Sequence, residues 1–132
     1  MNPIGRDQTL QFLTTAMTVA ERRHNLIASN IANVDTPGYR AKDLDFEAVM
    51  SGTLARIEGA APEKLEQVKQ RIIEEGLPIE TSTDTVYQQL DRNNVNLESE
   101  MAKLSAASGK YKLASRMYMY KLKLVKDVIA SR

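Results

Sequence analysis

The chain has 132 residues, a formal net charge of +1 and no cysteine, so it has neither a disulfide framework nor a thiolate metal site. Its length fits one domain with a modest core. No run of about 18 apolar residues occurs, so no membrane-spanning helix is expected, and no apolar segment follows Met1 to predict a cleaved secretory signal.

The first third of the chain predicts a long helix over about residues 7–33, with Asp7 as a candidate N-cap and Asn2-Pro3 as an earlier candidate. Apolar residues and one histidine recur at spacings that alternate between three and four residues. They are Leu10, Leu13, Met17, Ala20, His24, Ile27, Ile31 and Val34. This heptad seam favours packing along the whole helix against another helix.

A polar turn ends this helix. Thr36 precedes a proline, which biases it away from helical geometry, and Pro37-Gly38 fits a type II turn with glycine at positive φ. Asn33 is expected to close the helix in a left-handed conformation. Asparagine is a poor helix former, so Asn25, Asn30 and Asn33 near one helix end indicate side-chain hydrogen bonds to groups outside the helix. A plain helix stop without a recognition role is the alternative.

The middle of the chain is a mixed insert. Acidic residues alternate with apolar ones over 43–47, which indicates an extended segment; a calcium loop is disfavoured because Ala48 stands where glycine is required. The glycines at 52 and 59 indicate mobile connections. Pro62–Glu75 predicts a short helix that Gly76 and Pro78 terminate, and residues 79–83 predict a short strand or an extended linker.

A second long helix is predicted from about residue 96 to 131, with Asn96 as N-cap. Its seam also alternates steps of four and three: Leu97, Met101, Leu104, Ser108, Tyr111, Ser115, Tyr118, Leu122, Val125 and Ile129. Residues 101–132 contain eight Lys or Arg and one acid, Asp127. A nucleic-acid or membrane-surface role is possible for such a helix, but contact with acidic protein surfaces is favoured, so no nucleic acid and no direct membrane insertion are expected.

The predicted fold is all-α. Two long terminal amphipathic helices pair, parallel or antiparallel, as a coiled-coil-like unit joined by a partly irregular insert with a short helix. The expected parts of this single structural unit are an N-terminal assembly helix at 1–35, the turn, extended segment and mobile insert at 36–93, and a C-terminal assembly helix at 94–132. A pair this thin leaves apolar side chains uncovered, and uncovered apolar side chains mark an assembling protein. The side chains expected to be uncovered are Phe12, Leu26, Met117, Met119 and Tyr120.

No catalytic, cofactor or metal site is expected, and the chain is not predicted to be an enzyme. His24 is the only histidine and lies on the apolar seam, where a packed or interface residue is favoured over a general base. No phosphate-binding glycine loop and no nucleophile elbow occur.

Two segments carry a family resemblance. Ser29–Tyr39 resembles the N-terminal signature of the bacterial flagellar rod and hook proteins, and its continuation Arg40–Phe46 looks most like the proximal rod members. Asp91–Met101 resembles the family's C-terminal motif, with Arg92 where the family usually has glycine, so this turn is expected to differ in shape. The resemblance covers about residues 7–50 and 88–130.

The resemblance implies a structural subunit of the proximal rod. Such a subunit is exported uncleaved by the flagellar type III apparatus, orders its terminal segments on assembly, and polymerises into a periplasm-spanning tube that transmits torque and conducts exported subunits. The implied partners are the protein itself, rod proteins of the FlgC, FlgF and FlgG type, the ring-to-rod adaptor FliE and the export apparatus. Alternatives are another rod component such as FlgC, or a soluble helical adaptor or secretion chaperone, which should be a discrete folded dimer.

The residues predicted to make subunit contacts come from the turn and from the two seams. They are Asn30, Asn33, Asp35, Thr36, Pro37, Gly38, Tyr39, Leu10, Leu13, Met17, Ile27, Ile31, Met101, Leu104, Tyr111, Tyr118, Leu122 and Val125. On this hypothesis, replacing Asn33 or Gly38 blocks rod assembly and leaves export intact.

Overall fold

Two long helices and a smaller helical layer make up the fold. The computed structural model describes residues 6–74, 80–81 and 95–131. Its elements, in chain order, are α1 (Gln8–Ala32), β1 (Lys42–Asp43), α2 (Phe46–Glu58), the 3-10 turn η2 (Pro62–Lys64), α3 (Leu65–Glu74), β2 (Glu80–Thr81) and α4 (Leu97–Ala130). The expected all-α fold, with paired terminal helices joined by an insert that contains a short helix, is confirmed.

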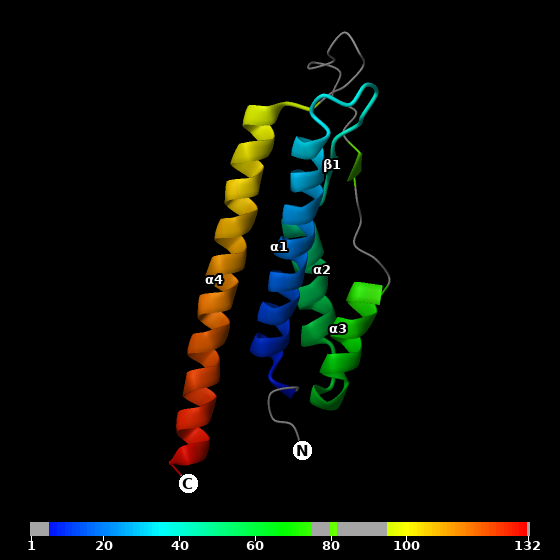
Figure 1. Cartoon of the computed structure of the whole chain (residues 1–132). Coiled ribbons are helices and arrows are strands. Elements are labelled where there is room, and N and C mark those ends of the chain that lie inside the picture. The colour runs from blue at the N-terminus through cyan, green and yellow to red at the C-terminus, as the bar shows by residue number, and fades with distance from the viewer. Residues whose placement is uncertain (1–5, 75–79, 82–94, 132) are drawn as a thin grey trace.

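The two terminal helices run antiparallel along each other (Figure 1). At one end the Asn30 amide donates to the Glu100 carboxylate at 2.8 Å, and at the other Lys121 Nζ lies 3.2 Å from an Asp7 carboxylate oxygen. This pairing decides between the parallel and antiparallel alternatives. Because α4 continues from Lys121 to Ala130, its last turns extend beyond the start of α1.

Side-chain caps fix the start of each long helix. The Leu10 N–H donates to Asp7 Oδ1 at 3.0 Å, and the Ser99 N–H donates to Asn96 Oδ1 at 3.0 Å. Each bond satisfies one of the helix's otherwise unpaired N–H groups, which stabilises the helix by about 1 kcal/mol. Both predicted N-caps are confirmed.

The helix α2 is a feature that the sequence pattern did not indicate. Asp45 caps it, accepting from the Ala48 N–H at 3.0 Å, and it continues through Gly52 to Glu58, with Gly59 as its C-cap. The expectation of a mobile connection at Gly52 is therefore wrong. The extended segment is also shorter than expected, because β1 covers only Lys42–Asp43 and Phe46 already begins the helix.

This extra helix places α1 in the middle of the molecule, with α4 on one side and α2 and α3 on the other (Figure 1). Consequently α1 is buried on more than its predicted seam, and Thr15, Ala16 and Val19 are also inaccessible. One core cluster spans both layers and contains Ala16, Val19, Leu44, Met50 and Ala114. Phe12 and Leu26, expected to be uncovered, pack half-buried against this cluster.

The rest of the insert agrees with the sequence. The predicted short helix is present as η2 followed by α3, and Leu65 is fully buried. Within 79–83, β2 pairs antiparallel with β1, with Lys42 opposite Thr81 and Asp43 opposite Glu80. Among the described residues, no helix is long and apolar enough to cross a membrane.

Candidate subunit-contact site

The polar turn after α1 has the expected geometry. The Tyr39 N–H donates to the Thr36 carbonyl at 3.2 Å, and Gly38 has φ of 72°. These are the four-residue hydrogen bond and the positive φ of a type II turn. The turn side chains Asp35, Thr36 and Pro37 are exposed.

Asn33 closes the helix differently from the prediction. Its backbone has φ of −104° and ψ of 17°, so the expected left-handed conformation is wrong. The side chain supplies the capping contacts instead: Asn33 Nδ2 donates to the Ser29 carbonyl at 2.8 Å, and Asn33 Oδ1 accepts from the Thr36 hydroxyl at 3.1 Å. A left-handed residue is not needed, because the amide side chain already satisfies a terminal carbonyl.

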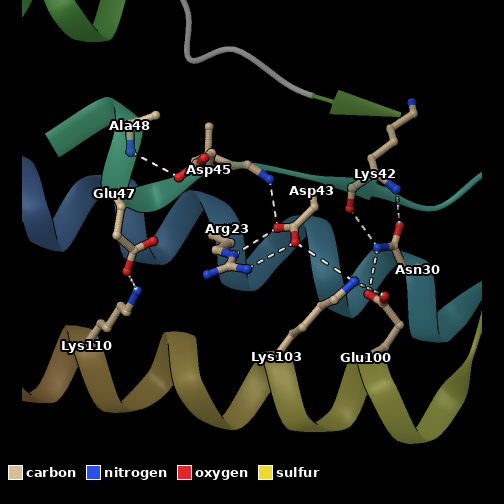
Figure 2. A network of polar contacts seen from close by, with 11 residues as sticks. Arg23, Asn30, Lys42, Asp43, Asp45, Glu47, Ala48, Glu100, Lys103 and Lys110 are labelled. Carbon is tan, nitrogen blue, oxygen red and sulfur yellow. Dashed lines mark hydrogen bonds and ion pairs between the residues drawn. The ribbon is translucent and has the colours of Figure 1, made fainter. Parts of the chain in front are cut away.

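Asn30, in contrast, points into the protein and has no exposed surface. Its Nδ2 donates to the Lys42 carbonyl at 2.7 Å and to Glu100 Oε2 at 2.8 Å (Figure 2). Its Oδ1 accepts from the Lys42 N–H at 2.9 Å and from the Tyr39 hydroxyl at 3.1 Å. Every hydrogen-bonding position of the amide is therefore used within the chain, which joins α1, β1 and α4.

A chain of charges continues from this amide (Figure 2). Glu100, only 3% exposed, pairs with Lys103 at 2.9 Å; Lys103 lies 3.9 Å from Asp43; and Arg23 donates two hydrogen bonds to Asp43, at 2.8 and 3.0 Å. Burial raises the pKa of Asp43, but hydrogen bonds from Arg23 and the Leu44 N–H outweigh it, and the pKa lies below its ordinary value. Opposite charges thus alternate across α1, β1 and α4.

A second polar contact joins α2 to α4. Lys110 Nζ pairs with the Glu47 carboxylate and lies 4.4 Å from the centre of the Phe46 ring. The hydrogen bond from Lys110 lowers the pKa of Glu47. The ion pairs that join different elements were not predicted from the sequence, because they depend on contacts between residues tens of positions apart, which no local pattern reports.

The predicted seam residues divide by burial. On α1, Leu10, Leu13 and Ile27 are buried and Met17 and Ile31 are half-buried. On α4, Leu104, Tyr118, Leu122 and Val125 are half-buried, whereas Met101 and Tyr111 are exposed. The residues of α4 that face α1 most closely are Glu100, Ala107 and Ala114, one heptad apart.

A large apolar surface remains uncovered on α4. Eleven large hydrophobic side chains of the described residues are exposed, and ten of them belong to this helix: Leu97, Met101, Tyr111, Leu113, Met117, Met119, Tyr120, Leu124, Val128 and Ile129. The eleventh is Leu54 on α2. The expected exposure of Met117, Met119 and Tyr120 is confirmed. Within the described part of the chain, no cluster of three or more metal-ligating side chains was found.

Known proteins match both the turn region and most of the chain. A family model described as "Flagella basal body rod protein" matches residues 10–40, which include most of α1 and the turn. The flagellar basal body rod protein FlgB of Bacillus subtilis (strain 168) is 34% identical over 110 residues, covering 83% of this chain and 84% of the relative. FlgB of Salmonella typhimurium is 28% identical over 129 residues, covering 93% of this chain and 94% of the relative.

FlgB of Proteus mirabilis (strain HI4320) shows a similar match, 29% identity over 111 residues, covering 80% of this chain and 81% of the relative. Each of these alignments covers at least 80% of the chain, far more than the turn alone. The chain therefore belongs to the flagellar basal body rod family, as a FlgB-type structural subunit of the proximal rod and not an enzyme.

Proposed function

We propose that this FlgB-type subunit polymerises through the surface of its terminal helices into a tubular shaft that transmits torque and conducts exported subunits. The observation that supports this proposal is the uncovered apolar surface of α4, which carries ten of the eleven exposed large hydrophobic side chains among the described residues. An exposed apolar patch of this extent marks an association site. A subunit with such a surface gains stability by burying it against neighbours.

The predicted contact residues then have two roles. Met101 and Tyr111 are exposed on α4 and contact neighbouring subunits directly. Leu10, Leu13 and Ile27 are buried on α1 and hold α4 in position from within. The half-buried seam residues contribute both to packing within the chain and to contacts with neighbouring subunits. They are Met17, Ile31, Leu104, Tyr118, Leu122 and Val125.

The turn is proposed as a separate contact point. Asp35, Thr36, Pro37 and Gly38 are exposed at the end of α1, on a backbone fixed by a hydrogen bond and by the positive φ of Gly38. A rigid exposed turn can bind a neighbour with little loss of conformational entropy. Asn30 and Tyr39 support the turn from inside, since their side chains hydrogen-bond to each other at 3.1 Å.

The proposed partners are the protein itself, rod proteins of the FlgC, FlgF and FlgG type, and the adaptor FliE. The flagellar type III apparatus is proposed to export the chain uncleaved. Family membership supports assembly with rod proteins in general. We also keep the expected partition, with 1–35 and 94–132 as assembly helices and 36–93 as the insert, which on this proposal contains α2 as well as α3.

The test compares matched apolar substitutions on two helices in a strain whose own FlgB gene is deleted. Leu113→Ser removes an exposed side chain from α4, and Leu54→Ser removes one from α2. We expect normal helicity by circular dichroism in both variants, loss of motility and of rod-containing basal bodies for Leu113→Ser, and normal motility for Leu54→Ser. Motile cells carrying the α4 substitution would contradict the proposal.

Two further measurements complete this test. The secreted amount of each variant should equal that of the unaltered chain, which places the defect after export. Light scattering on the purified chain separates a rod subunit from the chaperone alternative, because a chaperone should form a discrete folded dimer whereas the subunit should be monomeric before assembly.

A further inference from the structure

One side of α4, away from α1, carries a continuous row of exposed side chains at helical spacing. We call this row the outer stripe: Ala102, Ala106, Gly109, Leu113, Met117, Tyr120, Leu124 and Val128. The steps are three or four residues, so the members share one face of the helix. All eight are exposed, whereas the residues that face α1 are Glu100, Ala107 and Ala114. The helix therefore has two apolar sides and uses one of them within the chain.

The outer stripe changes character along its length. Its first part consists of Ala102, Ala106 and Gly109, and a Cβ added at Gly109 would meet nothing within 4 Å. Its second part contains large side chains, such as Met117 and Tyr120, which are 50% and 66% exposed. Small residues permit the close approach of a second helix backbone. A lipid surface gains nothing from them, since membrane-surface helices depend on large apolar side chains.

Cations that pair with no other described residue border this stripe. Lys103, Lys110 and Lys121 are already paired with carboxylates of the chain. Lys112, Arg116 and Lys123 lie along one edge of the stripe, are exposed and make no ion pair within the described residues, whereas the exposed acids on this side, Glu98 and Asp127, lie near the two ends of α4. The middle of this side of α4, over residues 109–124, therefore has an uncompensated positive charge, and an apolar surface bordered by it is complementary to an apolar surface bordered by carboxylates.

A second copy of this chain does not supply such a surface from its described helices. From Gln8 to Ala32, α1 has one acid and two arginines; α2 has two acids and one arginine; and α3 has two acids and two cations. Their net charges are +1, −1 and 0. A second α4 has three acids and seven cations, a net charge of +4, and would be repelled.

From these observations we infer that the outer stripe of α4 is the docking site for one amphipathic helix of a different protein, a helix whose apolar seam is flanked by Asp and Glu. The inference rests on the proposed assembly role of α4 and adds the kind of partner to it. The partner helix lies closest to α4 beside Gly109 and covers the large side chains farther along. Its carboxylates pair with Arg116, Lys123 and their neighbours, which steers association and rejects copies of the same chain.

The experiment titrates the full chain against two fluorescent synthetic helices of about 25 residues, the length of the stripe. Both carry the same leucine and alanine positions, and the flanking positions are Glu in one and Lys in the other. We expect the acidic helix to bind at least about tenfold more tightly than the basic one, with an advantage that falls as salt rises. Equal binding of the two helices would overturn the inference.

Two variants assign the binding to the stripe. The double variant Arg116→Glu, Lys123→Glu should reverse the preference between the two helices. Gly109→Leu should weaken binding of the acidic helix at least about tenfold without loss of helicity, because leucine favours the helix and a Cβ at this exposed position meets nothing within 4 Å. Unchanged preference in the first variant, or unchanged affinity in the second, contradicts docking at this face.

Other occupants are tested in parallel. Self-association of the chain that Leu113→Ser abolishes, or its co-sedimentation with phosphatidylglycerol vesicles that Leu113→Ser abolishes, would overturn the inference in favour of a copy or a membrane. The motility test separates this result from the proposed function. If Leu113→Ser stops rod assembly while the acidic and the basic synthetic helix bind equally, the proposed role of α4 in assembly stands. The inferred preference for a partner helix flanked by Asp and Glu is then wrong.

Discussion

The Asn30 amide and the Glu100 carboxylate lie 2.8 Å apart inside the protein, although 70 positions separate them in the chain. Asn30 comes from the last turns of α1 and Glu100 from the first turn of α4, so this contact sets the register of the antiparallel pair. The same amide holds both backbone polar groups of Lys42. One side chain of the family signature thus positions the strand and the second assembly helix together.

Replacement of Asn30 by alanine should destabilise the chain by about 3 kcal/mol. The change removes four hydrogen bonds and leaves buried Glu100 without its amide donor. Asn33→Ala should cost only about 1 kcal/mol, because the Asn33 contacts are at the surface. Urea unfolding followed by circular dichroism measures both values.

Asn25→Ala is the matched control, since Asn25 is exposed on the same helix. Alanine favours the helix, so this variant should be as stable as the unaltered chain or more stable by a few tenths of a kcal/mol. Equal unfolding midpoints for the Asn30 and Asn25 variants would mean that the buried amide does not hold the two helices together.

Alanine at Gly38 and alanine at Gly109 should have opposite effects. Gly38 has φ of 72°, where a side chain is strained, so Gly38→Ala should cost about 1 kcal/mol although a Cβ there meets nothing within 4 Å. Gly109 lies within α4 and also has open space at its Cβ, so Gly109→Ala should stabilise by up to about 1 kcal/mol. Thermal unfolding of the pair measures the difference, and a Gly38→Ala chain of unaltered stability would exclude backbone strain at the turn.

Local patterns in the sequence predict the two long helices because the residues that define these helices lie close together in the chain. The seams, the caps at Asp7 and Asn96 and the stop at Pro37-Gly38 each depend on residues within a few positions of each other. The same reasoning shows why α2 was not predicted. A glycine at 52 weakens its pattern, and the helix is stabilised by burial of Met50 and Ile57 in the protein interior, which no local signal reports.

The candidate site shows the same limit. The turn residues were predicted from the Pro-Gly pair, but the inward direction of Asn30 depends on Glu100 and Lys42, which belong to other elements. A seam identifies the apolar faces of α4 without deciding which of them α1 covers. Ala107 and Ala114 face α1 because small side chains allow close helix packing, and the larger Met101 and Tyr111 remain exposed.

Leu44→Ala should be among the more damaging single substitutions in the insert. Leu44 has no exposed surface and belongs to the cluster between the two layers, so the cavity should cost about 3 kcal/mol. Leu113→Ala removes the same atoms from the surface of α4 and should change stability by less than about 0.5 kcal/mol. Urea midpoints measure both variants, and similar losses would mean that Leu113 is covered in the free chain.

Acid should weaken the junction of α1, β1 and α4 through Asp43. The pKa of Asp43 is lowered in the folded chain, so its contribution to stability is complete above the ordinary pKa of 3.8 and is lost as the pH falls through the lower folded value. Glu47 and Glu66 also have lowered pKa values and add to the acid sensitivity, so the informative quantity is the difference between variants.

Urea midpoints measured between about pH 6 and 2 should decline less steeply for Asp43→Asn than for the unaltered chain. Arg23→Gln removes the cation that donates both hydrogen bonds to Asp43, and it should flatten the decline in the same way. An equally steep decline in all three chains would show that the Arg23–Asp43 pair makes no contribution to folding stability.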